Sequence, residues 1–173
     1  TNRRHDRWGG SAENRRRFHV ETVRRIRAAV GPDYPVLMKF GIMDDDEGGA
    51  TLEEGLATLG AMVEAGLDGV EISGGIGTGT RIPSRTSQAN VEEVYYRERA
   101  AAAKRAVGVP VILVGGIRSL ETAQEIVSTG DADFVALSRP LIREPDLINR
   151  WLRGVQFAAE CISCNKCQGI AGR

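Results

Sequence analysis

The chain has 173 residues, a length typical of a single domain built around one hydrophobic core. Its 23 Lys and Arg residues balance 23 Asp and Glu residues, so the net charge of zero argues against a nucleic-acid-binding protein. No stretch approaches the ~18 apolar residues of a membrane span, and no apolar signal region opens the chain. We therefore expect a cytoplasmic protein, or a piece of one, that does not bind membranes.

Four short apolar runs, each bounded by Gly, Pro or Asp, predict four β-strands. They are rich in Val, Ile and Leu, and they lack the polar–apolar alternation of a half-exposed strand. We therefore expect strands that are buried on both faces, as in a parallel sheet. The predicted strands are residues 36–40, 69–73, 111–114 and 134–137.

The intervals around these strands predict α-helices, most of them marked by a side chain that can cap the first turn. The predicted helices are residues 12–30, 52–65, 91–107, 120–128 and 146–152, and Ser11, Thr51, Asn90 and Ser119 are the expected caps of the first four. Alternation of helices and strands predicts parallel strands joined by right-handed crossovers.

An internal repeat refines this prediction. Residues 35–42 resemble residues 110–117, and residues 68–73 resemble residues 133–138, so one βαβα unit occurs twice. Repeated βα units suit a (β/α)8 barrel, which needs about 250 residues, so four strands supply half of one. An open doubly wound sheet is the alternative, and periodicity alone does not separate the two.

The residues after the third and fourth predicted strands form a candidate phosphate site. Gly115 and Gly116 let backbone N–H groups approach an anion without an intervening Cβ. Ser138 and Arg139 follow the next strand, and a guanidinium can bind an anion through two hydrogen bonds. The alternative is that the glycines only allow close packing of helix on strand, with Arg139 on the surface.

Lys39 is the second candidate, because it interrupts an otherwise apolar strand. A cation there is costly without a partner, so we expect it either to meet an electron-rich ligand atom or to be solvated at the strand end. The acidic residues 44–47 are interpreted as a solvated loop rather than as a metal site. The N-terminal arginines, Arg3, Arg4, Arg7, Arg15, Arg16 and Arg17, are expected to pair with acidic residues of this chain.

The three cysteines, Cys161, Cys164 and Cys167, have the spacing C-x2-C-x2-C. Thiolates with this spacing could hold zinc or an iron–sulfur cluster. Both usually need four ligands, and the sequence has three Cys residues. We therefore expect no metal site and keep an iron–sulfur cluster as the alternative.

Several of these segments together resemble the Old Yellow Enzyme family of FMN-dependent NAD(P)H:flavin oxidoreductases. Residues 2–15, NRRHDRWGGSAENR, are similar to the family pattern N-x-R-x-D-x-[YW]-G-G-S-x-E-N-R. Residues 114–117, VGGI, and residues 135–141, VALSRPL, resemble its two phosphate loops. Residues 161–165, CISCN, resemble the region after the barrel in the family's larger members.

The resemblance implies a (β/α)8 barrel of which this chain is the C-terminal half, with FMN and NAD(P)H as cofactors. It places Gly115, Gly116, Ser138 and Arg139 at the FMN phosphate and Lys39 beside the flavin pyrimidine edge. It implies transfer of hydride from NAD(P)H through FMN to an activated alkene or enoyl substrate. Residues 1–157 would be the FMN-phosphate half of the barrel and residues 158–173 a separate segment carrying the cysteines.

The substrate ligands and the proton donor of that family lie before the region of resemblance, so no catalytic residue is assigned in this chain. Two alternatives remain open. One is a non-catalytic half-barrel that pairs with a second copy, because its sheet edge and barrel interior would be exposed. The other is a different phosphate-binding barrel enzyme.

Overall fold

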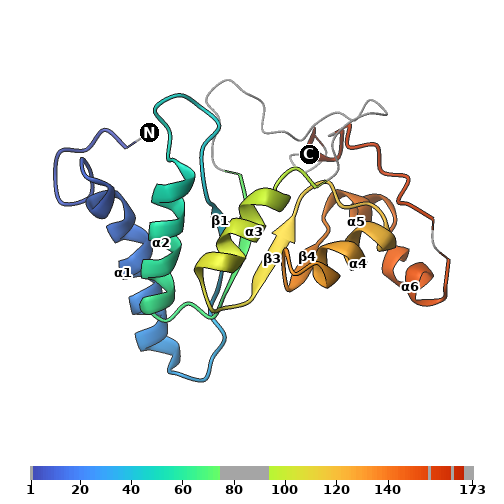
Figure 1. The fold of residues 1–173 in the computed structure, drawn as a ribbon, viewed down its shortest axis with the longest axis horizontal. Helices are drawn as coiled ribbons and strands as arrows, with labels where there is room; N and C mark the ends of the chain where they lie inside the picture. The colour runs from blue at the N-terminus through green and yellow to red at the C-terminus, as the bar shows by residue number, and fades with distance from the viewer. Residues whose placement is uncertain (1, 75–93, 156, 165, 170–173) are drawn as a thin grey trace.

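A computed structural model describes residues 2–74, 94–155, 157–164 and 166–169. Its elements, in chain order, are α1 (Ala12–Val30), β1 (Leu37–Gly41), α2 (Leu52–Glu64), β2 (Gly69–Ser73), α3 (Arg97–Ala106), β3 (Val111–Val114), α4 (Leu120–Ser128), β4 (Phe134–Ala136), α5 (Arg139–Arg143), α6 (Leu147–Leu152) and the 3-10 helix η1 (Lys166–Gly169). The strands form one parallel sheet in the order β1-β2-β3-β4. The four parallel strands and their alternation with helices are confirmed (Figure 1).

Three of the predicted caps are present at the helix starts. The hydroxyls of Ser11, Thr51 and Ser119 each accept a hydrogen bond from the backbone N–H three residues later, at 3.1 to 3.2 Å. Each bond satisfies an N–H that has no partner within its helix. The sequence therefore determines where these helices begin.

The start of the third helix was predicted wrongly. Asn90, its expected cap, lies outside the described residues, and α3 begins at Arg97 rather than at residue 91. Val94 has a φ of 62°, a left-handed conformation that a right-handed helix cannot contain. The helix α5 was not predicted, because its five residues are too few for an apolar period and Pro140 follows its first residue.

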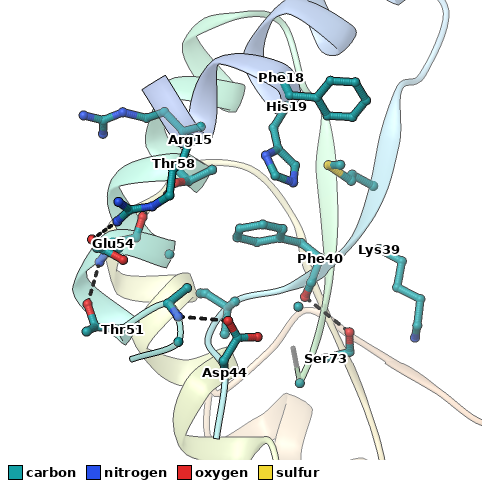
Figure 2. A pocket seen from close by; sticks show the side chains of 18 of the residues that line it. Arg15, Phe18, His19, Lys39, Phe40, Asp44, Thr51, Glu54, Thr58 and Ser73 are labelled. Atoms are coloured by element: carbon teal, nitrogen blue, oxygen red, sulfur yellow. Dashed lines mark hydrogen bonds and ion pairs between the residues drawn. The ribbon is translucent and has the colours of Figure 1, made fainter. Parts of the chain in front are cut away.

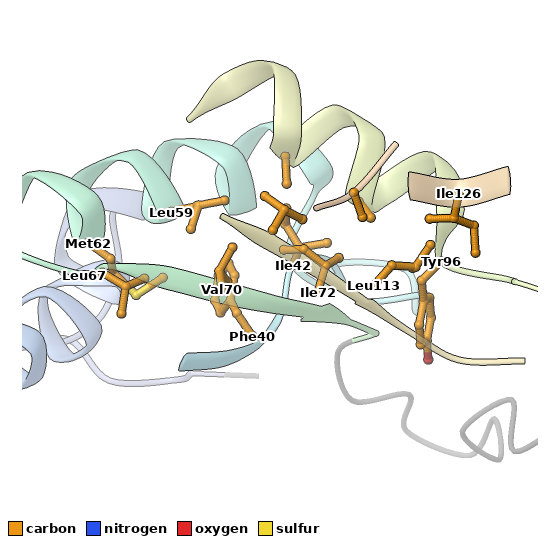
Figure 3. Close-up of a cluster of buried hydrophobic side chains, with 14 of the residues drawn as sticks. Phe40, Ile42, Leu59, Met62, Leu67, Val70, Ile72, Tyr96, Leu113 and Ile126 are labelled. Atoms are coloured by element: carbon orange, nitrogen blue, oxygen red, sulfur yellow. The ribbon is translucent and has the colours of Figure 1, made fainter. Parts of the chain in front are cut away.

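One face of the sheet packs against the helices and forms the core. Val70, Ile72 and Leu113 point to this face and are fully buried, as are Leu59 and Met62 of α2 (Figure 3). Helix α1 packs on α2, and α2 packs on α3. Burial of these aliphatic side chains is the main stabilising contribution of the fold.

The opposite face of the sheet corrects the prediction that the strands are buried on both sides. Lys39, Glu71, Ile112 and Phe134 stand side by side across the four strands on this face. Phe134 and Leu37 are each 58% exposed. In the described part of the chain, helices α1 to α4 build the core on the other face and leave these side chains exposed.

The sequence repeat corresponds to a repeated structural detail. Asp68, before β2, accepts a hydrogen bond from the Val36 N–H at 2.7 Å, and Asp133, before β4, accepts one from the Val111 N–H at 2.8 Å. Each aspartate thus fixes the start of the neighbouring strand. The pKa of each carboxyl is below its usual value, at Asp68 chiefly because of this N–H and at Asp133 chiefly because of a hydrogen bond with Lys104.

The segment after α6 folds back onto α6 and onto the loop after β3. Trp151 donates its indole N–H to the Phe157 carbonyl at 3.1 Å, and the N–H of Ala159 donates to the Arg118 carbonyl at 2.7 Å. Ala159 packs with Leu147 and Trp151. None of the helices in the described ranges is long and apolar enough to cross a membrane.

Candidate functional site

The predicted site residues gather at the carboxyl end of the sheet. Gly115 and Gly116 follow β3, and Ser138 and Arg139 follow the adjacent strand β4. A cleft of about 1550 Å³ is lined by Lys39, Gly115 and Arg139 among other residues. Gly116 and Ser138 lie next to this lining in the chain, so the structure places all five predicted residues at or beside one cleft.

The two glycines make a turn that other residues cannot make without strain. Gly115 has a φ of +115° and Gly116 a φ of +80°, both in the region that disfavours side chains. A Cβ on Gly115 would stand 2.7 Å from a ring carbon of Tyr95, and a Cβ on Gly116 would stand 2.6 Å from the Val94 nitrogen. Among the described residues, none of the turn, loop and cap hydrogen bonds between backbone groups uses either glycine N–H as a donor.

Arg139 brings a positive charge to this turn. It is the first residue of α5, and Ser138 occupies the cap position before it. The Arg139 guanidinium donates to the Tyr95 hydroxyl at 3.3 Å and to the Ser163 carbonyl at 3.5 Å. Both bonds are long, so a better acceptor, such as a phosphate oxygen, could replace them.

Lys39 lies on the exposed face of the sheet rather than in the core. Figure 2 shows Lys39 and Phe40 on opposite sides of β1. The Lys39 ammonium forms an ion pair with Glu71, its register partner on β2, and the Lys39 side chain is 59% exposed. The predicted cost of a buried, unpaired lysine therefore does not arise, because the ammonium is paired and partly solvated where Lys39 lines the cleft.

The part of the cleft between α1 and β1 is lined by aromatic side chains. Figure 2 shows His19 of α1 beside Phe18 and facing Phe40 of β1. The His19 ring lies edge-on to both, with centroid distances of 6.1 and 5.7 Å. Burial lowers the pKa of His19, which keeps the imidazole neutral near pH 7.

The cysteines are not gathered into a metal site in the described residues. Cys161 is buried, Cys164 is exposed and Cys167 is intermediate, and all three are free thiols. No group of three metal-ligating side chains occurs in the ranges that the structure describes. The Arg118 guanidinium donates to the Cys161 carbonyl at 3.4 Å, which attaches this segment to the loop after β3.

Four of the six arginines near the N-terminus pair with acidic residues of the chain, as expected for them. Arg4 pairs with Asp6, Arg7 with Glu21, Arg15 with Glu54, and Arg17 with Glu13. The pair between Arg15 and Glu54 joins α1 to the first turn of α2. Arg15 therefore contributes to the packing of α1 on α2.

Sequence reasoning missed Tyr95, which contacts three of the predicted site residues. Its ring lies within 3.1 Å of the Cβ position of Gly116, and its hydroxyl meets Arg139. The sequence analysis places Tyr95 within the predicted third helix, residues 91–107, whereas the structure places it before α3. The sequence carries no local signal for this contact, because it depends on how the turn before α3 crosses the strand ends.

Four parallel βα units, with neighbouring strands in chain order and polar groups at their carboxyl ends, define the architecture of half a (β/α)8 barrel. The glycine turn after β3 and Arg139 after β4 lie at this carboxyl end. The sequence profile of the NADH:flavin oxidoreductase / NADH oxidase family matches residues 1–156, and the chain belongs to this family. The predicted Old Yellow Enzyme relationship is confirmed, and the open doubly wound sheet is excluded.

Individual relatives agree with this assignment. The chain is 42% identical over 166 residues to an NADH oxidase of Thermoanaerobacter brockii, covering 95% of this chain and 25% of the relative. It is 28% identical over 187 residues to a cinnamate reductase of Clostridium sporogenes, covering 99% of this chain and 28% of the relative. A solved structure of 2-naphthoyl-CoA reductase with 2-naphthoyl-CoA superposes with a TM-score of 0.80 at 29% identity, over 95% of this chain and 25% of that one.

These relatives are much longer than the chain. The chain spans about a quarter of the length of the NADH oxidase and of the naphthoyl-CoA reductase. A (β/α)8 barrel has eight strands, and this chain contributes four to the described structure.

Proposed function

We propose that this chain is the FMN-phosphate-binding part of an FMN-dependent NAD(P)H oxidoreductase. The observation that carries the proposal is the turn formed by Gly115 and Gly116, with Arg139 beside it at the carboxyl end of the sheet. A turn of this kind offers backbone N–H groups to a phosphate, and the guanidinium supplies the counter-charge. The family membership supports flavin as the ligand.

Different residues of this chain would bind different parts of FMN. The N–H groups of Gly115, Gly116 and Ser138 and the side chain of Arg139 would bind the phosphate. Lys39, on the exposed face of β1, would stand beside the flavin pyrimidine edge and stabilise negative charge there. FMN, when bound, would carry hydride from NAD(P)H to the acceptor.

The acceptor we propose is an activated alkene or an enoyl compound. The names of two relatives, a cinnamate reductase and a 2-naphthoyl-CoA reductase, support an unsaturated bond conjugated to a carbonyl group. The residues that would bind this substrate and protonate it are not assigned in this chain. We therefore expect the 173-residue chain to bind FMN weakly and to turn over poorly by itself.

The test compares FMN with riboflavin, which lacks the phosphate. Titration calorimetry of the chain should show tighter binding of FMN. Arg139→Met should weaken FMN binding by about 10- to 100-fold, the usual effect of losing a hydrogen bond to a charged group. Riboflavin binding should not change. Arg143→Met, in the same helix and paired with Glu160, is the matched control. Equal affinity of the unmodified chain for FMN and riboflavin would refute the proposal.

The exposed face of the sheet favours a second candidate, self-association of two copies. Leu37 and Phe134 each present an aromatic or aliphatic side chain that is 58% exposed. Pairing of two such faces would bury them and cover the edges at β1 and β4. Light scattering should then show a dimer at micromolar concentration. A monomer at every concentration would exclude this candidate.

The proposed enzyme is cytoplasmic, which fits three thiols that form no disulfide with one another. Its proposed organisation is a flavin-binding region, residues 1–157, followed by the cysteine segment, residues 158–173. A cluster held by Cys161, Cys164 and Cys167 remains the less favoured alternative. Iron and sulfide analysis of anaerobically purified protein tests it.

A further inference from the structure

The turn that would bind the phosphate is covered by a side chain of this protein. Tyr95 presents opposite edges of one ring to the two glycines: Cε2 lies 2.7 Å from the Cβ position of Gly115, and Cε1 lies 3.1 Å from that of Gly116. The same ring ends in a hydroxyl that accepts the 3.3 Å hydrogen bond from Arg139. A single residue therefore contacts both the backbone and the charged part of the candidate anion site.

The Tyr95 ring packs against a buried neighbour, Tyr96. Its neighbour Tyr96 is only 6% exposed and packs edge-on to Tyr95, with ring centroids 4.6 Å apart. Tyr96 thus belongs to the core, whereas the Tyr95 ring is half-buried and lies over the glycines that follow β3. Rotation of Tyr95 would not require Tyr96 to leave the core.

The backbone just before Tyr95 is strained. Val94 has a φ of 62°, which is unfavourable for any residue with a side chain and most unfavourable for a β-branched one. The nitrogen of Val94 is also the atom closest to the Cβ position of Gly116, at 2.6 Å. Strain of this kind persists where the surrounding contacts impose it, and it clusters at active sites, ligand clamps and switch regions.

We propose that Tyr95 is a gate for the phosphate: its hydroxyl takes the place of a phosphate oxygen on Arg139, and its ring must move away before the phosphate can reach the glycine turn. The proposal rests on the function proposed above, since it concerns the same site. A phosphate oxygen is the stronger acceptor for a guanidinium, so the ligand displaces the hydroxyl. The apparent affinity for FMN is then reduced by the fraction of molecules in which the gate is closed.

The gate predicts that removing the ring strengthens binding. Tyr95→Ala should bind FMN about two- to tenfold more tightly, because neither the hydrogen bond to Arg139 nor the ring over the glycines then has to be displaced. Tyr95→Phe keeps the ring but not the hydroxyl, so its affinity should lie between those of the unmodified chain and Tyr95→Ala. Riboflavin, which has no phosphate, should bind equally to all three. Tyr34→Ala, which removes a 63% exposed ring, is the matched control and should leave both affinities unchanged.

A second measurement does not depend on the folding of Tyr95→Ala. The chain has three tyrosines, so incorporation of 3-fluorotyrosine gives three fluorine resonances, which single Tyr→Phe variants assign. The Tyr95 resonance should shift when FMN is added and should shift much less with riboflavin. The Tyr34 resonance should not move.

Several results would overturn the gate. If Tyr95→Ala and Tyr95→Phe both bind FMN more weakly, Tyr95 is a ligand of the phosphate instead. If neither variant changes the FMN affinity and the Tyr95 resonance does not shift when FMN is added, Tyr95 has no part in the site. In both cases tighter binding of FMN than of riboflavin would still support the proposed function, whereas loss of that difference in the unmodified chain would refute the function itself.

Discussion

Substitution of Gly55 by Ala tests whether the tertiary contact or the helix propensity controls stability at this position. Gly55 is buried in α2, where the helix crosses the residue that follows β1. A Cβ added there would overlap the carbonyl oxygen of Ile42 and stand 2.8 Å from its carbonyl carbon. Ile42 cannot yield easily, because it is fully buried and its N–H donates to the Ser73 carbonyl at 3.2 Å.

The expected magnitude follows from two opposing contributions. Ala is more favourable than Gly within a helix by about 0.5–1 kcal/mol. Overpacking against a fixed backbone costs about 1–3 kcal/mol, and more when the backbone cannot shift. We therefore expect Gly55→Ala to lower the free energy of unfolding by about 1–2 kcal/mol or more, which lowers Tm by roughly 2–4 °C per kcal/mol for a chain of this size.

The same helix supplies the control. A Cβ on Gly60 would meet nothing within 4 Å, so Gly60→Ala should gain about 0.5–1 kcal/mol from helix propensity alone. Urea unfolding followed by circular dichroism, with the m-value checked for each variant, gives both free energies. Opposite signs are expected for one substitution at two positions of one helix. A stabilising effect at both positions would refute the steric argument.

Two further predictions concern the strand ends. Gly116→Ala should weaken FMN binding about tenfold or more and lower stability by about 1–3 kcal/mol, because it places a side chain at positive φ. Gly108→Ala, where a Cβ meets nothing within 4 Å, should do neither. Equal FMN affinities of the two variants in flavin titrations would contradict the proposed role of the glycine turn. Asp133→Asn should destabilise the protein near pH 7, because hydrogen bonding to Lys104 keeps the pKa of Asp133 below its usual value. The ionised form of Asp133 contributes stability above the usual carboxyl pKa of about 3.9, and this contribution is lost as the pH falls through the lower folded value. The difference in Tm between the variant and the unmodified protein should therefore shrink with acidification; a constant difference from pH 7 to pH 2, or an equal effect of Asp33→Asn, would argue against this role.

Most of the fold could be predicted from the sequence because its signals are local. Apolar runs of four or five residues marked the four strands, and hydroxyl side chains such as Ser11 marked the helix starts. The two loops that we propose bind the phosphate could also be located from the sequence, because their glycines and arginine directly follow strands. Such features depend on propensity and periodicity within a few residues, which the chain carries whatever surrounds it.

The tertiary structure alone decided the contacts between distant segments. It paired Lys39 with Glu71, because the register of two strands that are far apart in the chain brings them level. It left one face of the sheet exposed, because the helices that build the main core, α1 to α4, lie on the side of the other face. It placed Tyr95 over Gly115, because the turn before α3 crosses the strand end. Each of these contacts depends on register and on layer packing, and no window of neighbouring residues encodes either.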